Sequence, residues 1–147
     1  MFCWLKKGKF MLSAYYKLWV DAIISEKTKK DRQSSWKAFT IVPISIMMGI
    51  NLFTLLYWTS VFTHHELPLI LIITFSHDTL INIFLSAILM FFIPFLLLNY
   101  LLIFYNSRYE NLIKTYKANN GKWYRKYYLI SIGLLVIPII FKWIFQI

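Results

Sequence analysis

The hydrophobic pattern of the chain contains three long stretches with almost no charge. Residues 38–63 and 79–105 contain no charged side chain, and residues 127–147 contain only Lys142, near one end. A helix needs about 20 apolar residues to cross the hydrocarbon core of a bilayer. A lysine near a helix end can extend its ammonium group to the headgroups. The pattern predicts an all-α integral membrane protein in which three transmembrane helices cover these stretches of a membrane domain, 38–147.

A shorter apolar segment over residues 67–75 does not fit a fourth span. Its nine residues, LPLILIITF, are too few to cross a bilayer as a helix, and Pro68 stands near its start. We expect a re-entrant or interfacial segment, or an outer extension that packs on the helices.

The first 37 residues are basic and predict an amphipathic helix over about residues 10–25. Polar side chains recur there every four residues, and the rest of the helix surface is apolar. Such a helix suits the cytoplasmic lipid surface, where anionic headgroups attract the flanking lysines. The alternative is a helix packed under the bundle. The polar stripe comprises Lys9, Ser13, Lys17, Asp21 and Ser25.

Helical spacing continues past the second span and predicts a cytoplasmic helical hairpin over residues 106–126. Tyr105, Tyr109 and Tyr116 lie on one face of this continuation. Residues 119–121, Asn-Asn-Gly, favour the left-handed backbone that ends a helix. We therefore expect one long helix that leaves the membrane, turns here and re-enters as the third span.

Composition supports a membrane protein and excludes several other classes. Of the 147 residues, 59% are apolar and 15% are charged, whereas soluble domains have about 45–50% apolar and about 25% charged residues. The chain is too hydrophobic for a disordered protein or a nucleic-acid-binding domain, so we expect no nucleic acid partner. Its single cysteine, Cys3, excludes a disulfide scaffold.

The distribution of basic residues predicts the orientation in the membrane. Residues 1–37 hold nine lysines and arginines and residues 108–126 hold six, whereas residues 64–78 hold none. Because basic residues in short loops stay on the cytoplasmic side, we expect a cytoplasmic amino terminus and a carboxyl terminus outside. The expected location is a bacterial inner (plasma) membrane, with anionic lipids at the cytoplasmic face as partners.

One cluster of ionisable side chains lies in the outer connection, between the first two spans. Zinc accepts imidazole and carboxylate ligands and can activate a water molecule for hydrolysis. The spacing matches no zinc motif, so we favour helix ends in water, with Ser76 and Asp78 capping the second helix. We expect neither a metal nor another cofactor. The cluster comprises His64, His65, Glu66, His77 and Asp78.

Polar residues and prolines within the spans are the remaining site candidates. An asparagine in hydrocarbon needs a hydrogen-bond partner, and a proline leaves the carbonyl four residues earlier without one. One interpretation is that these residues form hydrogen bonds and kinks through which the helices pack. The other is that they line a pore in an oligomer. The candidates are Asn51, Thr54, Asn82, Pro94, Asn99 and Pro138.

The sequence contains no catalytic triad, glycine-rich phosphate loop or carboxylate pair. We therefore expect a non-catalytic partner protein: an accessory subunit or a toxin-immunity protein that binds another membrane protein, or a homo-oligomer. The first alternative is a self-assembling pore or membrane-disrupting effector. The second is a small membrane enzyme that uses the outer histidine and carboxylate cluster.

Overall fold

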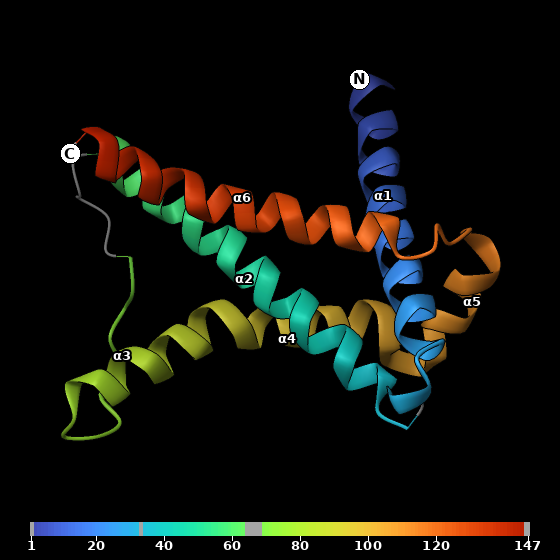
Figure 1. Cartoon of the computed structure of the whole chain (residues 1–147), viewed down its shortest axis with the longest axis horizontal. Helices are drawn as coiled ribbons and strands as arrows, with labels where there is room; N and C mark the ends of the chain where they lie inside the picture. The colour runs from blue at the N-terminus through green and yellow to red at the C-terminus, as the bar shows by residue number, and fades with distance from the viewer. Residues whose placement is uncertain (1, 33, 64–68, 146–147) are drawn as a thin grey trace. The chain divides into compact units, whose positions relative to one another are not determined.

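A computed structural model describes residues 2–32, 34–63 and 69–145, and this part of the chain is helical without a strand. Figure 1 labels its α-helices from α1 to α6. Their bounds are α1 Phe2–Lys27, α2 Trp36–Phe62, α3 Thr79–Ala87, α4 Ile93–Asn99, α5 Arg108–Thr115 and α6 Lys122–Phe145. Tighter and wider turns lie between them: the 3₁₀ turns η1 Lys30–Arg32 and η4 Tyr105–Ser107, and the π turns η2 Ile88–Phe92 and η3 Tyr100–Phe104.

Among the described residues, three helical stretches are long and apolar enough to cross a membrane, which confirms the predicted all-α membrane fold with three transmembrane helices. They are Trp36–Val61, Thr79–Thr115 and Lys122–Phe141. The chain is a multi-pass membrane protein. The second stretch has 37 residues, well above the roughly 20 that the hydrocarbon core requires, so part of it extends beyond the core.

The second stretch contains a π turn directly before its proline. The backbone N–H of Ile93 donates to the carbonyl of Ile88, five residues earlier. Pro94 has no N–H to donate, so a regular α-helical bond is impossible at that position. A π turn is a common way to accommodate such a defect without ending the helix.

The expected single long helix after the second span is interrupted at Asn106 and Ser107. Both residues have left-handed backbone angles, with φ of 52° and 54°, and they separate η3 from α5. A second left-handed pair follows α5, at Asn120 (φ 50°) and Gly121 (φ 75°). This second pair lies at the turn where the sequence predicts one.

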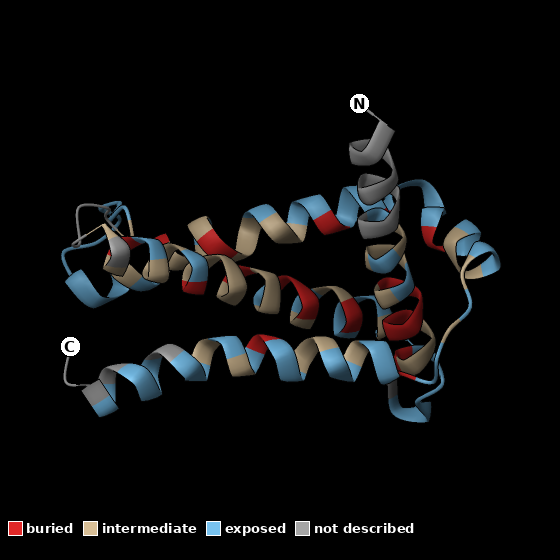
Figure 2. Cartoon of the chain, turned by 90° about the horizontal axis from the view of Figure 1, so that it is seen from above, coloured by how far each residue is buried: buried red, intermediate tan, exposed pale blue. Residues whose placement is uncertain are grey.

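The chain forms two compact units, which we describe separately. The first comprises residues up to Ile41 together with residues 100–129. Its core contains fully buried apolar residues of α1 and one fully buried isoleucine of η3. Figure 2 shows the buried band on α1 in red. These core residues are Trp19, Val20, Ala22, Ile23 and Ile103.

The predicted amphipathic surface helix over residues 10–25 is not confirmed. The helix α1 begins at Phe2 and ends at Lys27, and Asp21, assigned to the exposed polar stripe, is fully buried. A four-residue period marks one helix face, but it does not say whether water or protein covers that face. Here protein covers the part of the stripe that contains Asp21.

The second unit comprises residues 42–99 and the residues from 130 onward. In it, α2 approaches η2 so closely at Gly49 that an added Cβ atom would overlap the backbone carbonyl of Phe91. The rings of Phe53 and Phe91 meet edge to face, with centroids 5.5 Å apart. The part of α6 in this unit is mostly exposed, as the pale blue ribbon in Figure 2 shows.

Candidate functional site

Asp21 is a buried cap for a helix that follows about a hundred residues later in the sequence. Its Oδ1 accepts hydrogen bonds from the backbone N–H groups of Asn119 (2.7 Å) and Gly121 (2.9 Å), and its Oδ2 from those of Trp123 (2.9 Å) and Tyr124 (3.2 Å). The first N–H groups of a helix have no partner within it, and its N-terminus carries a partial positive charge. The Asp21 carboxylate satisfies these donors at the start of α6.

The turn before α6 brings these donors together. Gly121 is buried, and a Cβ atom at this position would lie 3.1 Å from Ser25 Oγ of α1. Glycine therefore meets two requirements at this position: it adopts the positive φ, and it permits the close approach of α1.

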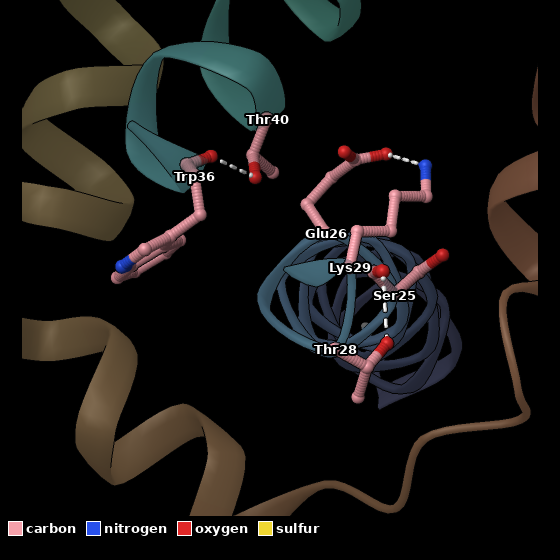
Figure 3. A network of polar contacts seen from close by, with 6 residues as sticks. All are labelled: Ser25, Glu26, Thr28, Lys29, Trp36 and Thr40. Carbon is pink, nitrogen blue, oxygen red and sulfur yellow. Dashed lines mark hydrogen bonds and ion pairs between the residues drawn. The ribbon is translucent and has the colours of Figure 1, made fainter. Parts of the chain in front are cut away.

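The second carboxylate of α1, Glu26, is also buried and bonded. Its Oε1 lies 2.6 Å from Lys29 Nζ. The Thr28 hydroxyl donates to a carbonyl of α1 at 3.0 Å, and the Thr40 hydroxyl donates to the Trp36 carbonyl at 2.7 Å. Dashed lines mark these three contacts in Figure 3. Both buried carboxylates of α1 thus serve the packing of the first unit.

Four aromatic rings form what we call the aromatic cluster: Trp19, Trp36, Phe104 and Tyr109. The centroid distances are 5.2 Å for Trp36–Tyr109, 5.8 Å for Trp19–Phe104 and 6.1 Å for Trp36–Phe104. Such offset and edge-on contacts are favourable because the ring edge is positive and the ring face negative. The cluster joins α1, α2, η3 and α5 within the first unit.

Two lysines lie over this cluster. Lys27 Nζ is 4.5 Å from the Trp36 ring centroid and 5.2 Å from that of Tyr109. Lys37 Nζ is 5.8 Å and 5.4 Å from the same two centroids. Each ammonium group is within the distance at which the negative ring face attracts a cation.

Tyr15 of α1 lies beside the cluster, with its ring centroid 6.3 Å from that of Trp19. Burial raises the pKa of Tyr15 to about 12. The phenol therefore keeps its proton at physiological pH and contributes no charge to this unit.

The polar candidates within the spans bond to other residues of the second unit. Asn51 Nδ2 donates to Ser131 Oγ at 3.0 Å and joins α2 to α6. Asn99 Nδ2 donates to Ser45 Oγ at 2.9 Å and joins α4 to α2. Thr54 is buried and donates to the carbonyl one turn earlier in α2.

The two proline candidates are placed differently by the structure. Pro94 is exposed and follows the π turn η2. Pro138 lies in α6, but its side chain is outside the described residues.

The third asparagine candidate, Asn82, forms hydrogen bonds with the backbone of the segment that precedes α3. Its Oδ1 accepts from the N–H groups of Phe75 and Ser76, both at 2.8 Å, and its Nδ2 donates to the Ser76 carbonyl at 2.8 Å. One turn later, Ser86 Oγ accepts from the N–H of Ile73 at 2.8 Å. A further turn on, Met90 Sδ accepts from the N–H of Leu71 at 3.3 Å.

This ladder defines what we call the outer segment, residues 69–78. Side chains spaced by four along the α3–η2 helix bond to backbone groups spaced by two along the segment. A period of two is typical of an extended backbone. The segment therefore lies along α3 as an extended chain, one of the arrangements that the sequence left open.

The histidine and carboxylate candidates are only partly described. His64, His65 and Glu66 lie outside the described residues, while His77 and Asp78 are exposed. Asp78 caps α3, with Oδ1 accepting from the N–H of Leu80 at 2.9 Å. Among the described residues, no group of three histidine, cysteine or carboxylate side chains is arranged to hold a metal.

The second unit also contains an apolar cavity of about 570 Å³. Its walls come from α2, α3, η2, the outer segment and α6, and include Gly49, Phe53, Ile70, Phe91 and Leu135. The lining residues offer no side chain that could act as an acid, a base or a nucleophile.

The chain matches no family model, no curated protein and no solved structure, so the residues alone carry the functional argument. Sequence reasoning missed Asp21, Ser86 and the serines that pair with Asn51 and Asn99. The four-residue spacing of Asn82 and Ser86 was a usable signal for the ladder. No sequence pattern marked Ser45 and Ser131, because the asparagines that they bond are distant in sequence.

Proposed function

We propose that this chain is a non-catalytic partner protein in a bacterial inner membrane, either an accessory subunit or a toxin-immunity protein. It acts by binding another membrane protein or a second copy of itself. The observation that carries this proposal is the outer segment, which uses only one of its two backbone edges.

The segment bonds to α3 through the N–H groups of Ile73 and Phe75 and to η2 through that of Leu71. Alternate residues of an extended chain direct their N–H and C=O groups to opposite edges. Ile72 and Thr74 therefore present theirs away from α3, and within the described residues these groups have no hydrogen bond. This edge is open.

Backbone groups without hydrogen-bond partners on the open edge are unfavourable in free energy where water cannot reach them. A backbone group without a partner costs several kcal/mol wherever hydrocarbon or protein excludes water from it, and an extended partner strand would satisfy the whole row at once. The exposed side chains of Leu71, Ile72 and Phe75 add apolar area to such a contact. These features support a binding role for the segment.

The alternative functions receive less support. A pore requires Asn51 and Thr54 to face water, whereas both bond within the second unit. An enzyme that uses the outer histidine and carboxylate cluster requires proton-transfer groups there, whereas Asp78 of that cluster already caps α3.

The open edge is tested by photocrosslinking in intact cells. A photoreactive phenylalanine analogue at Ile72 is expected to form one adduct of defined mass, at twice the chain mass if the partner is a second copy. The same probe at Leu97 of α4 is the control, because the two side chains are equally exposed, at 57% and 56%, and only Ile72 lies on the edge. Thr74→Pro removes one edge N–H and is expected to abolish the adduct. No adduct at Ile72, or one that survives Thr74→Pro, contradicts the proposal.

We further propose that the amino terminus is cytoplasmic and the outer segment faces outside, as the positions of the basic loops indicate. With Cys3 changed to serine, a cysteine at His77 is expected to react with a membrane-impermeant thiol reagent in intact cells. A cysteine at Lys117 is expected to react only after lysis. Both positions are exposed in the structure, so the difference reports the side of the membrane. Labelling of position 117 in intact cells would reverse the orientation.

A further inference from the structure

Lys27 and Lys37 come from different helices, yet their ammonium groups lie over the same two rings. Lys27 is the last residue of α1 and Lys37 is the second of α2. Both Nζ atoms are within 5.4 Å of the Tyr109 ring centroid. Two like charges that share the same rings repel each other, while the ring faces attract each of them.

Three carboxylates of the same unit have other partners. Glu26 is bonded to Lys29, the Asp21 carboxylate is occupied by four backbone amides, and Glu110 accepts the hydroxyl of Tyr109 at 3.2 Å. Within the described residues, neither Lys27 nor Lys37 forms an ion pair. The pair therefore offers two donors of like charge to an external anion.

The position of the pair indicates which anion this is. Trp36 is the first residue of the membrane-spanning stretch Trp36–Val61. Tryptophan and tyrosine rings at the ends of spans lie at the level of the headgroups. Lysines at this level face the phosphates of anionic lipids, which attract them electrostatically.

We propose that Lys27 and Lys37, held over Trp36 and Tyr109, form a binding site for the phosphate of an anionic phospholipid headgroup. Each ammonium group donates a charge-assisted hydrogen bond to a phosphate oxygen. The aromatic faces hold both lysines in place before the lipid arrives, which lowers the entropy lost on binding. This site is independent of the partner contact proposed for the outer segment.

The test measures binding of phosphatidylglycerol to the full-length protein in neutral detergent. Lys27→Gln/Lys37→Gln is expected to weaken binding about 25-fold, since each lysine near an anionic surface contributes roughly a fivefold factor. The control, Lys114→Gln/Lys117→Gln, removes the same charge from exposed lysines of the same unit. It is expected to change binding less than threefold. Lys27→Arg/Lys37→Arg keeps both charges and is expected to retain most of the binding.

Two further measurements distinguish a lipid phosphate from free inorganic phosphate as the ligand. Phosphatidylcholine is expected to bind wild type at least tenfold more weakly than phosphatidylglycerol, and millimolar inorganic phosphate is expected not to displace the lipid. Displacement by inorganic phosphate would make this a general phosphate site and overturn the lipid proposal. Equal losses in the glutamine pair and its control would also overturn it, because they would indicate diffuse attraction to the basic surface.

Discussion

Replacing Asp21 with alanine is expected to lower the free energy of unfolding by about 3 kcal/mol or more. The substitution removes a carboxylate that accepts hydrogen bonds from four backbone N–H groups. Three of these bonds, from residues 119, 121 and 123, are 2.7–2.9 Å long. A hydrogen bond to a charged group contributes about 1.5–3 kcal/mol, and each buried donor left without a partner costs about 1–3 kcal/mol. Water that enters the vacated space can accept hydrogen bonds from some of these N–H groups. The expected loss of stability is therefore well below the sum of the four individual contributions.

The measurement is reversible unfolding of the purified protein in mixed micelles. Asp31→Ala is the matched control because Asp31 is exposed in η1, and we expect a change below about 0.5 kcal/mol. Asp21→Asn is expected to lie between wild type and Asp21→Ala, since an amide keeps one acceptor oxygen but turns its NH₂ group toward the other donors. A stable Asp21→Ala protein would show that the cap is dispensable.

Gly49→Ala is expected to lower the free energy of unfolding by about 3 kcal/mol, at the upper end of the range for overpacked cores. The added methyl group would overlap the carbonyl oxygen of Phe91 and lie 2.9 Å from its carbonyl carbon. Because the obstacle is backbone, no side-chain rotation relieves the overlap. The helices α2 and η2 must separate, and the edge-to-face contact of Phe53 with Phe91 is lost with them.

Gly133→Ala provides the control for this prediction. Gly133 also lies within a membrane-spanning helix, but apart from its chain neighbours and the backbone of its own helix, no described atom lies within 4 Å of an added Cβ. We expect this variant to be neutral or up to about 1 kcal/mol more stable, since alanine favours helix over glycine. The two variants, compared by the same unfolding assay in micelles, separate close packing from helix propensity. Equal effects would refute the packing argument.

The sequence predicts the spans well because hydrocarbon excludes charge. The first predicted span, 38–63, corresponds to α2, Trp36–Phe62, and the second begins at Thr79 in both. The third predicted span starts at 127, within α6, and the helix itself begins earlier, at Lys122. Charged residues mark where the membrane ends, whereas the Asp21 carboxylate and the turn at Gly121 determine where the helix begins.

The candidate site was harder to predict because its contacts are distant in sequence. Spacing alone placed Asp21 on a helix face, but nothing local reveals that backbone amides about a hundred residues later cover that face. The same holds for Asn51 with Ser131. The need for a partner was predictable from the cost of an asparagine in lipid, but the identity of the partner was not.

The long sequence separation of the Asp21 cap imposes an order on biosynthesis. Ribosomes add about 5–20 residues per second, so α1 exists for several seconds before residues 119–124 are made. The α2 to α4 stretches emerge from the ribosome during that interval. The first unit is therefore completed late, and until then the Asp21 carboxylate lacks the backbone donors that it has in the folded protein. The nascent chain thus exposes a carboxylate that the mature protein buries.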